Sequence, residues 1–311
     1  MTILLTGASG FVGKAVLKTA LEHGFKIRPV YRVMDSAQGQ LYDSVVCGLE
    51  EAVDWSKALL GVDVVIHTAA LTHKMYERII DPFAEYRRVN IEGTLNLARQ
   101  AAVNGVRRFI FISSIKVNGE ASLPGCPFTA DDDPAPIDAY GLSKAEAEAR
   151  LMQVARETSM EVTIIRPPLI YGSGVKGNFA NLILLVNRGL PLPLGGLTSN
   201  RRSLVGLNNL VDLILVCINH PKGANQIFLV SDGEDLSTTD LLLRITKALG
   251  RKETLFRVPK SFINFIAWLI GKEAVAQRLL GSLQVDIKKT HELLDWKPSV
   301  TVDEELRRAV S

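Results

Sequence analysis

The chain has 311 residues, of which 47% are hydrophobic, and its 36 basic and 33 acidic residues give a net charge of +3. This length allows one large domain, or a large domain with a smaller one, and the balanced charge gives no support for nucleic-acid binding. The three cysteines form no CxxC pair and the five histidines show no metal-ligand spacing. We therefore expect reduced thiols, a cytoplasmic protein and no metal site.

The first two-thirds of the chain alternates short β-branched runs with longer helical patterns. The runs are apolar at consecutive positions, as in strands that are buried on both faces. This alternation predicts an α/β fold with a doubly wound parallel sheet. The expected strands are Thr2–Thr6, Lys26–Tyr31, Ser44–Cys47, Asp63–His67, Arg107–Ser113 and Glu161–Arg166, and the expected helices are Phe11–His23, Asp54–Leu60, Pro82–Asn104 and Ala139–Thr158.

A glycine-rich turn follows the first expected strand and opens the first expected helix. It reads Thr-Gly-Ala-Ser-Gly-Phe-Val-Gly over Thr6–Gly13. Gly7 permits a tight turn, Gly10 lets the backbone approach a pyrophosphate, and Gly13 lets the helix pack closely on the sheet. The free N–H groups at the start of the helix favour phosphate. We therefore predict a dinucleotide site that begins with Gly7, Ser9, Gly10, Phe11, Val12 and Gly13.

The end of the second expected strand bears on the choice of cofactor. An acidic residue about 20 positions after the turn commonly binds the adenosine ribose, but this strand ends in Tyr31 and Arg32. A guanidinium there can pair with a 2′-phosphate. The sequence thus favours NADP(H) and leaves NAD(H) as the alternative. The other interpretation of Arg32 is a solvated loop residue.

A second set of residues has the pattern of proton-transfer chemistry. Tyr140 and Lys144 are four residues apart at the start of an expected helix, so both side chains can point into one site. A lysine cation favours the phenolate form of a tyrosine, which otherwise has a pKa near 10. Ser113 and Ser114 end the strand before this helix, at the edge where such sheets bind ligands. A hydroxyl there can polarise the reacting oxygen.

These motifs resemble the extended short-chain dehydrogenase/reductase family, and its nucleotide-sugar epimerases, dehydratases and reductases in particular. Other stretches that match are Val65–Ala70, Val89–Thr94, Ser113–Gly119 and Arg166–Gly172. The resemblance implies a Rossmann domain with Ser114, Tyr140 and Lys144 as catalytic residues and with Asn90 supporting the site. Tyr140 would be the acid/base, and Lys144 would hold the nicotinamide ribose. It also implies cofactor contacts from Leu49, Thr68, Ala69, Ala70, Tyr140, Lys144 and Pro167.

Two positions depart from the family pattern. Cys47-Gly48-Leu49 stands where members often have an aspartate that contacts adenine, so that side-chain contact is missing. Asn118 replaces a common tyrosine in the turn after Ser114. We expect this replacement to alter the substrate side of the pocket.

The strand–helix alternation stops at Pro167-Pro168. We expect residues 1–166 to form the NAD(P)-binding core, and residues 167–311 to form mainly a smaller substrate-binding region with some segments returning to the core. By resemblance, Asn178 and Arg202 would contact a substrate diphosphate. Arg201 is the alternative to Arg202, and two solvated surface charges are the third interpretation. The expected substrate residues are Ser114, Tyr140, Asn178, Arg202 and Asp286.

The resemblance is closest to bacterial polysaccharide enzymes that reduce 4-keto-6-deoxy nucleotide sugars. The first expectation is therefore NADPH-dependent reduction of the 4-keto group of a UDP-linked 4-keto-6-deoxy-N-acetylhexosamine, with a product of the UDP-N-acetylquinovosamine type. A UDP-sugar 4-epimerase that retains NAD is the alternative. An NADPH-dependent reductase of non-nucleotide ketones and a non-catalytic NADP(H) sensor are further alternatives.

An apolar stretch late in the chain, Phe262–Ile270, bears on membranes and partners. Its nine residues are too few to span a bilayer as a helix, which takes about 20. We expect a helix buried in the protein, and the alternative is a helix lying on a membrane surface. Relatives often dimerise through two long helices, here Pro82–Asn104 and Ala139–Thr158, so a homodimer is also expected from the resemblance.

Overall fold

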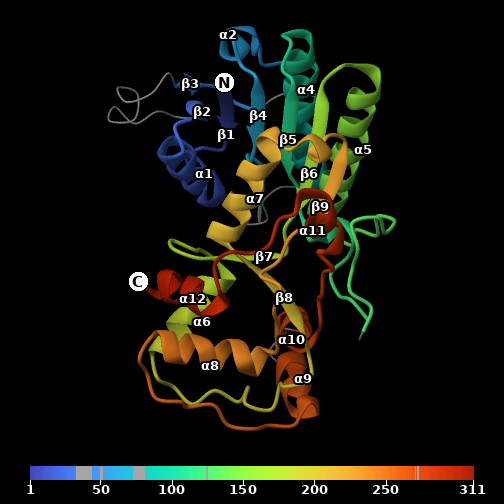
Figure 1. The fold of residues 1–311 in the computed structure, drawn as a ribbon. Helices are drawn as coiled ribbons and strands as arrows, with labels where there is room; N and C mark the ends of the chain where they lie inside the picture. The colour runs from blue at the N-terminus through green and yellow to red at the C-terminus, as the bar shows by residue number, and fades with distance from the viewer. Residues whose placement is uncertain (33–43, 50–51, 73–80, 124, 270, 272) are drawn as a thin grey trace.

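The protein is built on a parallel sheet of seven strands, in the order β3-β2-β1-β4-β5-β6-β9 (Figure 1). The computed structural model describes residues 1–32, 44–49, 52–72, 81–123, 125–269, 271 and 273–311. All six neighbouring pairs are parallel. This confirms the predicted fold class. The strands are β1 (Thr2–Thr6), β2 (Lys26–Tyr31), β3 (Val45–Val46), β4 (Val64–His67), β5 (Arg108–Ile112), β6 (Glu161–Arg166) and β9 (Gln226–Leu229).

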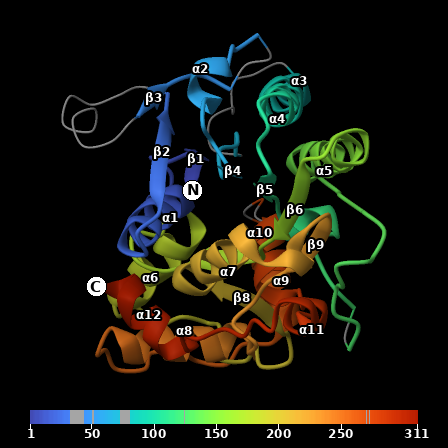
Figure 2. The ribbon, with the colours of Figure 1, turned by 45° about the horizontal axis from the view of Figure 1, so that its top comes forward.

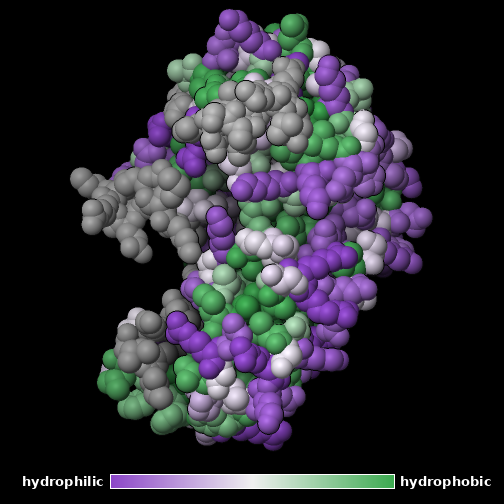
Figure 3. Space-filling model, turned by 90° about the vertical axis from the view of Figure 1, so that its left-hand side faces the viewer, coloured by the Kyte–Doolittle hydropathy of each residue, from purple (hydrophilic) through white to green (hydrophobic). Residues whose placement is uncertain are grey.

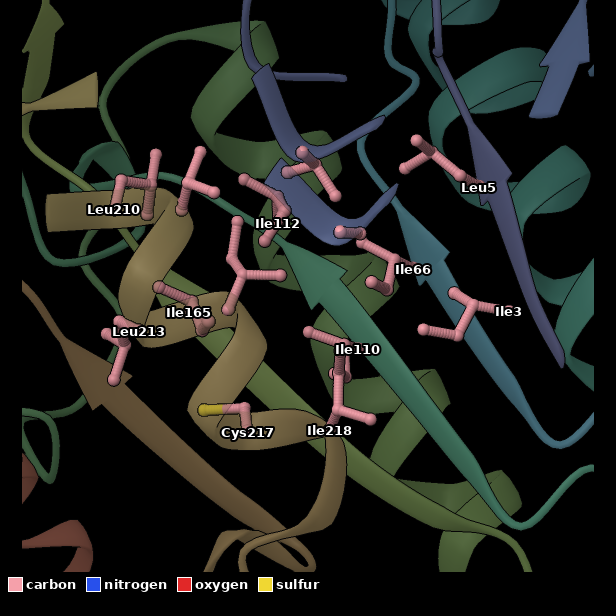
Figure 4. Packing of buried hydrophobic residues seen from close by; sticks show 14 of the residues in the cluster. Ile3, Leu5, Ile66, Ile110, Ile112, Ile165, Leu210, Leu213, Cys217 and Ile218 are labelled. Carbon is pink, nitrogen blue, oxygen red and sulfur yellow. The ribbon is translucent and has the colours of Figure 1, made fainter. Parts of the chain in front are cut away.

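Helices cover both faces of this sheet (Figure 2). One face packs against α1 (Phe11–Glu22) and α7 (Leu207–Asn219), and the other packs against α2 (Ser56–Leu59), α4 (Thr94–Val103) and α5 (Ala139–Glu157). Every residue of β4 and β5 is buried, which explains why their sequences do not alternate. Figure 4 shows the first face, where strand residues Ile3, Leu5, Ile66, Ile110, Ile112 and Ile165 meet Leu210, Leu213, Cys217 and Ile218 of α7.

The expected long helix Pro82–Asn104 is interrupted by a wider turn. It consists of α3 (Pro82–Tyr86), a π-helical segment η2 (Arg87–Gly93) and α4. Gly93 explains part of this geometry, because a Cβ there would lie 1.8 Å from the Leu49 carbonyl oxygen. The segment thus passes directly against the loop after β3. Such π-helical insertions occur frequently at functional sites.

The C-terminal part is built on a second, three-stranded sheet in the order β10-β8-β7. A hydrophobic core of its own, called here the C-terminal core, joins side chains of this sheet to α6, α8 and α12. Two elements of the same part of the chain return to the seven-stranded sheet. Strand β9 forms its edge, and α7 packs on one of its faces. The elements are β7 (Leu169–Tyr171), α6 (Asn178–Asn187), β8 (Arg202–Gly206), β10 (Asp235–Leu236), α8 (Thr238–Ala248), α9 (Lys260–Leu269), α10 (Glu273–Leu280), α11 (Lys288–Leu294) and α12 (Val302–Val310), with short 3-10 turns η3 (Ile115–Val117) and η4 (Pro221–Gly223).

The prediction that Phe262–Ile270 is a buried helix is wrong. The helix exists as α9, but Phe262, Phe265 and Trp268 are more than half exposed. Among the described residues of this helix, Ile263 is the one that packs on the hydrophobic core of the C-terminal part. Ile270 lies outside the described residues. None of the described helices is long and apolar enough to cross a bilayer.

The two helical stretches proposed for dimer formation pack against each other. Both α3 and α4 contact α5. Ion pairs also link them, with Arg150 of α5 bonded to Glu92 of η2 at 3.0 Å. A single chain does not test pairing between copies, so the homodimer stays a prediction.

Candidate active site

The glycine-rich turn between β1 and α1 has the shape that a dinucleotide needs. Gly7 has φ +72°, which favours glycine, and its carbonyl accepts from the Gly10 N–H at 2.8 Å. A Cβ on Gly13 would lie 2.0 Å from the Gly7 oxygen. The first turn of α1 therefore packs so closely on this loop that only glycine fits. Without side chains at these positions, the loop leaves its backbone open to a pyrophosphate.

A pocket opens beside this turn, at the carboxyl ends of β1, β2 and β4. Figure 3 shows a hollow between the upper part of the molecule, which holds the seven-stranded sheet, and the lower part. Eight of the predicted cofactor residues line the pocket: Gly7, Ser9, Gly10, Arg32, Leu49, Thr68, Ala69 and Ala70. Residues not predicted from the sequence also line it, namely Thr6, Val30, Tyr31, Cys47, Leu71, Arg88 and Val89.

Three predicted cofactor residues of α1 lie outside this lining. Phe11 and Val12 are partly buried and pack against the hydrophobic core on the sheet face that α1 and α7 cover. Gly13 is buried beneath the turn. The side chains of Phe11 and Val12 thus shape the turn from behind. Their backbone N–H groups still stand in the first turn of α1, where a phosphate would bind.

Two arginines line the pocket. Arg32 is exposed and follows the last residue of β2, and Arg88 reaches the pocket from η2. Arg88 also donates to Glu85 at 2.9 Å. None of the described residues that line the pocket is acidic. Arg88 was missed, although it lies directly before Val89–Thr94, a stretch that carried the family resemblance.

The predicted catalytic residues stand at the carboxyl edge of β5 and at the start of α5. Ser114 is the N-cap of η3, and its Oγ accepts from the Lys116 N–H at 3.3 Å. Asp138 caps α5 by accepting from the Gly141 N–H at 2.7 Å, and its other oxygen pairs with the Lys116 ammonium. The cap that begins the helix bearing Tyr140 is thereby tied to the turn bearing Ser114.

Burial perturbs both titrating groups of this set. Burial raises the pKa of Tyr140 well above its ordinary value, and Asp138 and Tyr86 raise it further. Burial also lowers the pKa of Lys144 from 10.5 to about 7, while Glu148 opposes this shift. The Lys144 ammonium donates to the Ile112 carbonyl at 2.9 Å and lies 4.3 Å from the centre of the Phe111 ring. A phenolate at Tyr140 therefore requires positive charge beside it.

A buried ionic network includes Ser113, the residue before Ser114, and was not predicted from the sequence. Arg166, at the end of β6, donates three hydrogen bonds to Glu148 of α5, at 2.6 to 3.1 Å. Ser113 donates to the same carboxylate. Both charged side chains are almost fully buried. The network therefore fixes α5, which carries Tyr140 and Lys144, to the ends of β5 and β6.

Asn118 belongs to this network rather than to the pocket surface. Its side chain is 3% exposed, accepts from Arg166 at 2.9 Å and donates to the Thr129 carbonyl at 2.9 Å. The effect that we expect from this replacement on the substrate side of the pocket stays a prediction. The amide points inward because it offers an acceptor to a buried guanidinium.

Polar side chains around Asn90 support the cofactor side of the site. Asn90 pairs with both backbone groups of Leu71 and donates to Ser143 Oγ at 3.2 Å. The supporting role that the resemblance implied for Asn90 stays a prediction. His67 lies between Thr6 and Thr94, and burial, with Lys144 nearby, lowers its pKa to about 3. It is therefore neutral at physiological pH.

The remaining predicted residues lie farther along the chain. Pro167 is buried, and its carbonyl accepts from the Ile115 N–H at 3.0 Å, just after Ser114. Asn178 begins α6, and Arg202 begins β8 and donates to the Gly281 carbonyl at 3.2 Å. Asp286 accepts from the Lys288 N–H. Their contacts with substrate stay predictions.

A parallel sheet with a phosphate-binding turn, and with serine, tyrosine and lysine at its carboxyl edge, defines a dinucleotide-binding protein of the extended short-chain dehydrogenase/reductase type. Residues 3–231 match the NAD dependent epimerase/dehydratase family, and the chain belongs to this family. It is 48% identical to a UDP-glucose 4-epimerase of Vibrio cholerae, over 97% of this chain and 92% of that protein.

Solved structures show the same fold over the whole chain. A UDP-glucuronic acid 4-epimerase from Bacillus cereus, in complex with NAD, matches with a TM-score of 0.80 at 21% identity, covering 100% of this chain and 97% of that one. A UDP-glucose 4-epimerase from Thermotoga maritima, with UDP-glucose, matches with a TM-score of 0.77 at 23% identity, with coverage of 100% and 97%.

These comparisons correct the expected activity. The expected 4-keto reductase is wrong, because the 48% identical relative that spans nearly the whole chain is a 4-epimerase. The sequence argument had placed this epimerase second. The prediction of an enzyme of the extended short-chain dehydrogenase/reductase type is confirmed.

Proposed function

We propose that this protein is a UDP-sugar 4-epimerase that keeps its nicotinamide cofactor through the catalytic cycle. The observation that carries the proposal is the 48% identity to a UDP-glucose 4-epimerase over nearly the full chain. The fit of the glycine-rich turn to a dinucleotide supports it, because Gly7 and Gly13 leave no room for a Cβ.

Tyr140 would act as the acid and base on the sugar 4-hydroxyl. It would take the hydroxyl proton as C4 is oxidised, and it would return a proton when C4 is reduced again. Bound NAD would supply the acceptor for the C4 hydrogen and its two electrons. Lys144, one helical turn after Tyr140, would hold positive charge near the phenolate and offset the burial that opposes it. Ser114 Oγ would donate to the same sugar oxygen.

Inversion at C4 also sets a demand on the substrate region. The hydrogen must return to the opposite face of the same carbon, so the sugar ring has to turn over while the nucleotide end stays bound. We propose that Asn178 and Arg202 hold the diphosphate during this turn. A guanidinium that binds oxygens in a fixed geometry suits that role.

The finer choice of cofactor is a separate proposal. We infer that the adenosine end also accepts a 2′-phosphate, because Arg32 and Arg88 line it and no acidic residue does so among the described residues. Thermal shift with NAD⁺ and NADP⁺ tests this inference. Arg32→Ala should weaken NADP⁺ binding more than NAD⁺ binding. Equal losses for both cofactors would contradict it.

The activity test uses purified protein without added cofactor. Interconversion of UDP-glucose and UDP-galactose, and of their N-acetyl forms, can be followed by NMR of the anomeric protons. We expect conversion by the natural protein and its loss in Tyr140→Phe. Thr163→Ser, in the buried sheet, is a folding control that leaves the site intact. Absence of conversion with all these sugars, in protein that carries bound NAD, would refute the proposal.

A further inference from the structure

Helix α9 presents a cluster of large apolar side chains to solvent. Phe262, Phe265, Trp268 and Leu269 are 51%, 55%, 63% and 67% exposed. Their spacing of three, three and one residues gathers them on one side of the helix. The rings of Phe265 and Trp268 are 6.2 Å apart. Contiguous exposed patches of this kind mark sites of interaction.

The opposite side of α9 is attached to the protein. Ile263 packs on the C-terminal core, which lies between the three-stranded sheet and α6, α8 and α12. The Lys260 ammonium donates to Ser199 Oγ at 2.6 Å. The helix begins against Pro259, whose carbonyl accepts from the Phe262 N–H at 3.0 Å. The aromatic face is thus the side left over after α9 has docked. Figure 1 shows α9 at the end of the molecule opposite β1 and α2.

Exposed basic residues outnumber exposed acidic ones in the chain that leads into α9. Exposed basic side chains stand before α9 at Arg251, Lys252 and Arg257, and a fourth, Lys260, is the first residue of the helix. The exposed acidic residues among the described positions of 251–273 are Glu253 and Glu273. An exposed apolar helix face next to a segment with net positive charge is the combination that binds the surface of an anionic bilayer.

A second copy of this chain fits the face less well. A two-fold contact through α9 would bring the basic segments before the two α9 helices close to each other, and like charges across an interface oppose association. Tryptophan and phenylalanine beside lysine and arginine instead match the boundary between headgroups and acyl chains. The ten residues of α9 are also too few to span the bilayer, which takes about 20.

We propose that α9 is a membrane-surface helix, which lies in the plane of an anionic lipid bilayer with Phe262, Phe265 and Trp268 inserted among the headgroups. The basic residues before it contact lipid phosphates. The enzyme is thereby held reversibly at the bilayer by one short helix, with no spanning segment. A single small anchor of this kind gives weak binding, which depends on the charge of the lipid and on salt.

Tryptophan fluorescence provides a direct test. Of the three tryptophans, Trp55 and Trp296 are buried at 0% and 4% exposure, so a change on membrane binding reports Trp268. The full-length protein is mixed with vesicles of phosphatidylethanolamine and phosphatidylglycerol, or with vesicles of phosphatidylcholine alone. We expect a blue shift and co-flotation with the anionic vesicles, and reversal of both by high salt. No blue shift and no flotation with anionic vesicles would overturn the proposal.

Variants distinguish membrane binding through the aromatic face of α9 from non-specific binding through other exposed apolar residues. Phe262→Ser with Phe265→Ser should reduce flotation by more than about tenfold, and Arg257→Gln with Lys252→Gln by roughly 30-fold. The matched control replaces two apolar residues elsewhere, Leu60→Ser with Leu123→Ser, which are 75% and 73% exposed, and it should float like the natural protein.

Epimerase activity on soluble UDP-sugars should be unchanged in all these variants, which separates this proposal from the proposed function. Equal flotation of the aromatic variant and the control would count against the helix. A concentration-dependent dimer that the aromatic variant alone abolishes would assign the face to a second copy instead.

Discussion

Glu148→Gln should cost this protein a large part of its stability. The substitution removes the charge that pairs with Arg166, whose side chain is 2% exposed, so a guanidinium is left buried without a counter-charge. Breaking such a pair by removing one partner costs about 3–5 kcal/mol. Glutamine retains one acceptor oxygen for the three Arg166 hydrogen bonds, so we expect about 3 kcal/mol.

The assay is urea unfolding of Glu148→Gln, Arg166→Met and the double variant. Removing both charges also removes the unpaired guanidinium, so the double variant should be more stable than the sum of the single losses predicts, by about 2 kcal/mol. The control is Glu292→Gln, whose pair with Lys288 is exposed on both sides, and it should change stability by less than about 0.5 kcal/mol. A loss below about 1 kcal/mol for Glu148→Gln would refute this reasoning.

Three further predictions follow from contacts of single residues. Gly13→Ala should abolish NAD⁺ binding measured by calorimetry, because its Cβ would meet the Gly7 oxygen; near-normal affinity would contradict the packing argument. Gly93→Ala should lower the melting temperature, because its Cβ would strike the Leu49 carbonyl; an unchanged melting curve would count against that contact. Folding lowers the pKa of Lys144 from 10.5 to about 7. Between these two pH values the unfolded state therefore binds more protons than the folded state. This group makes the free energy of unfolding rise with pH, by at most roughly 1.4 kcal/mol per pH unit. Lys144→Met should flatten that rise in unfolding measured from pH 7 to 10, and an identical slope in both proteins would exclude it.

The fold could be predicted from sequence because local patterns report burial directly. Continuous apolar runs such as Val64–His67 indicated strands covered on both faces, and the glycines of the first turn indicated a close approach of helix and loop. The strand Gln226–Leu229 was missed. It has only four residues, and it joins the sheet through pairing with β6, more than 60 positions earlier.

Side-chain networks were the part that sequence could not supply. The pairing of Glu148 with Arg166, and the inward turn of Asn118 toward the same guanidinium, depend on three elements meeting in space. The exposure of α9 was missed for a related reason. Hydrophobicity indicates that a segment avoids water, but it does not say which surface covers that segment.

The error in the activity has its own physical cause. A reductase and an epimerase require the same serine, tyrosine and lysine, because both move a proton on one sugar oxygen and a hydrogen on its carbon. Arg32 bears on the group attached to the adenosine ribose. It does not report whether the cofactor leaves after each turnover, and that difference separates the two activities.

The crossing of the chain between the two sheets limits how this protein can be divided. After the chain leaves the seven-stranded sheet at β6, α7 and β9 come back to it, and α7 contributes Leu210, Leu213 and Ile218 to its core. A fragment that stops at residue 166 would lack an edge strand and expose one face of the sheet to water. The C-terminal part therefore cannot be exchanged as one continuous segment. Its segments outside the seven-stranded sheet, from β7 to β8 and from β10 to α10, lie between these returns of the chain.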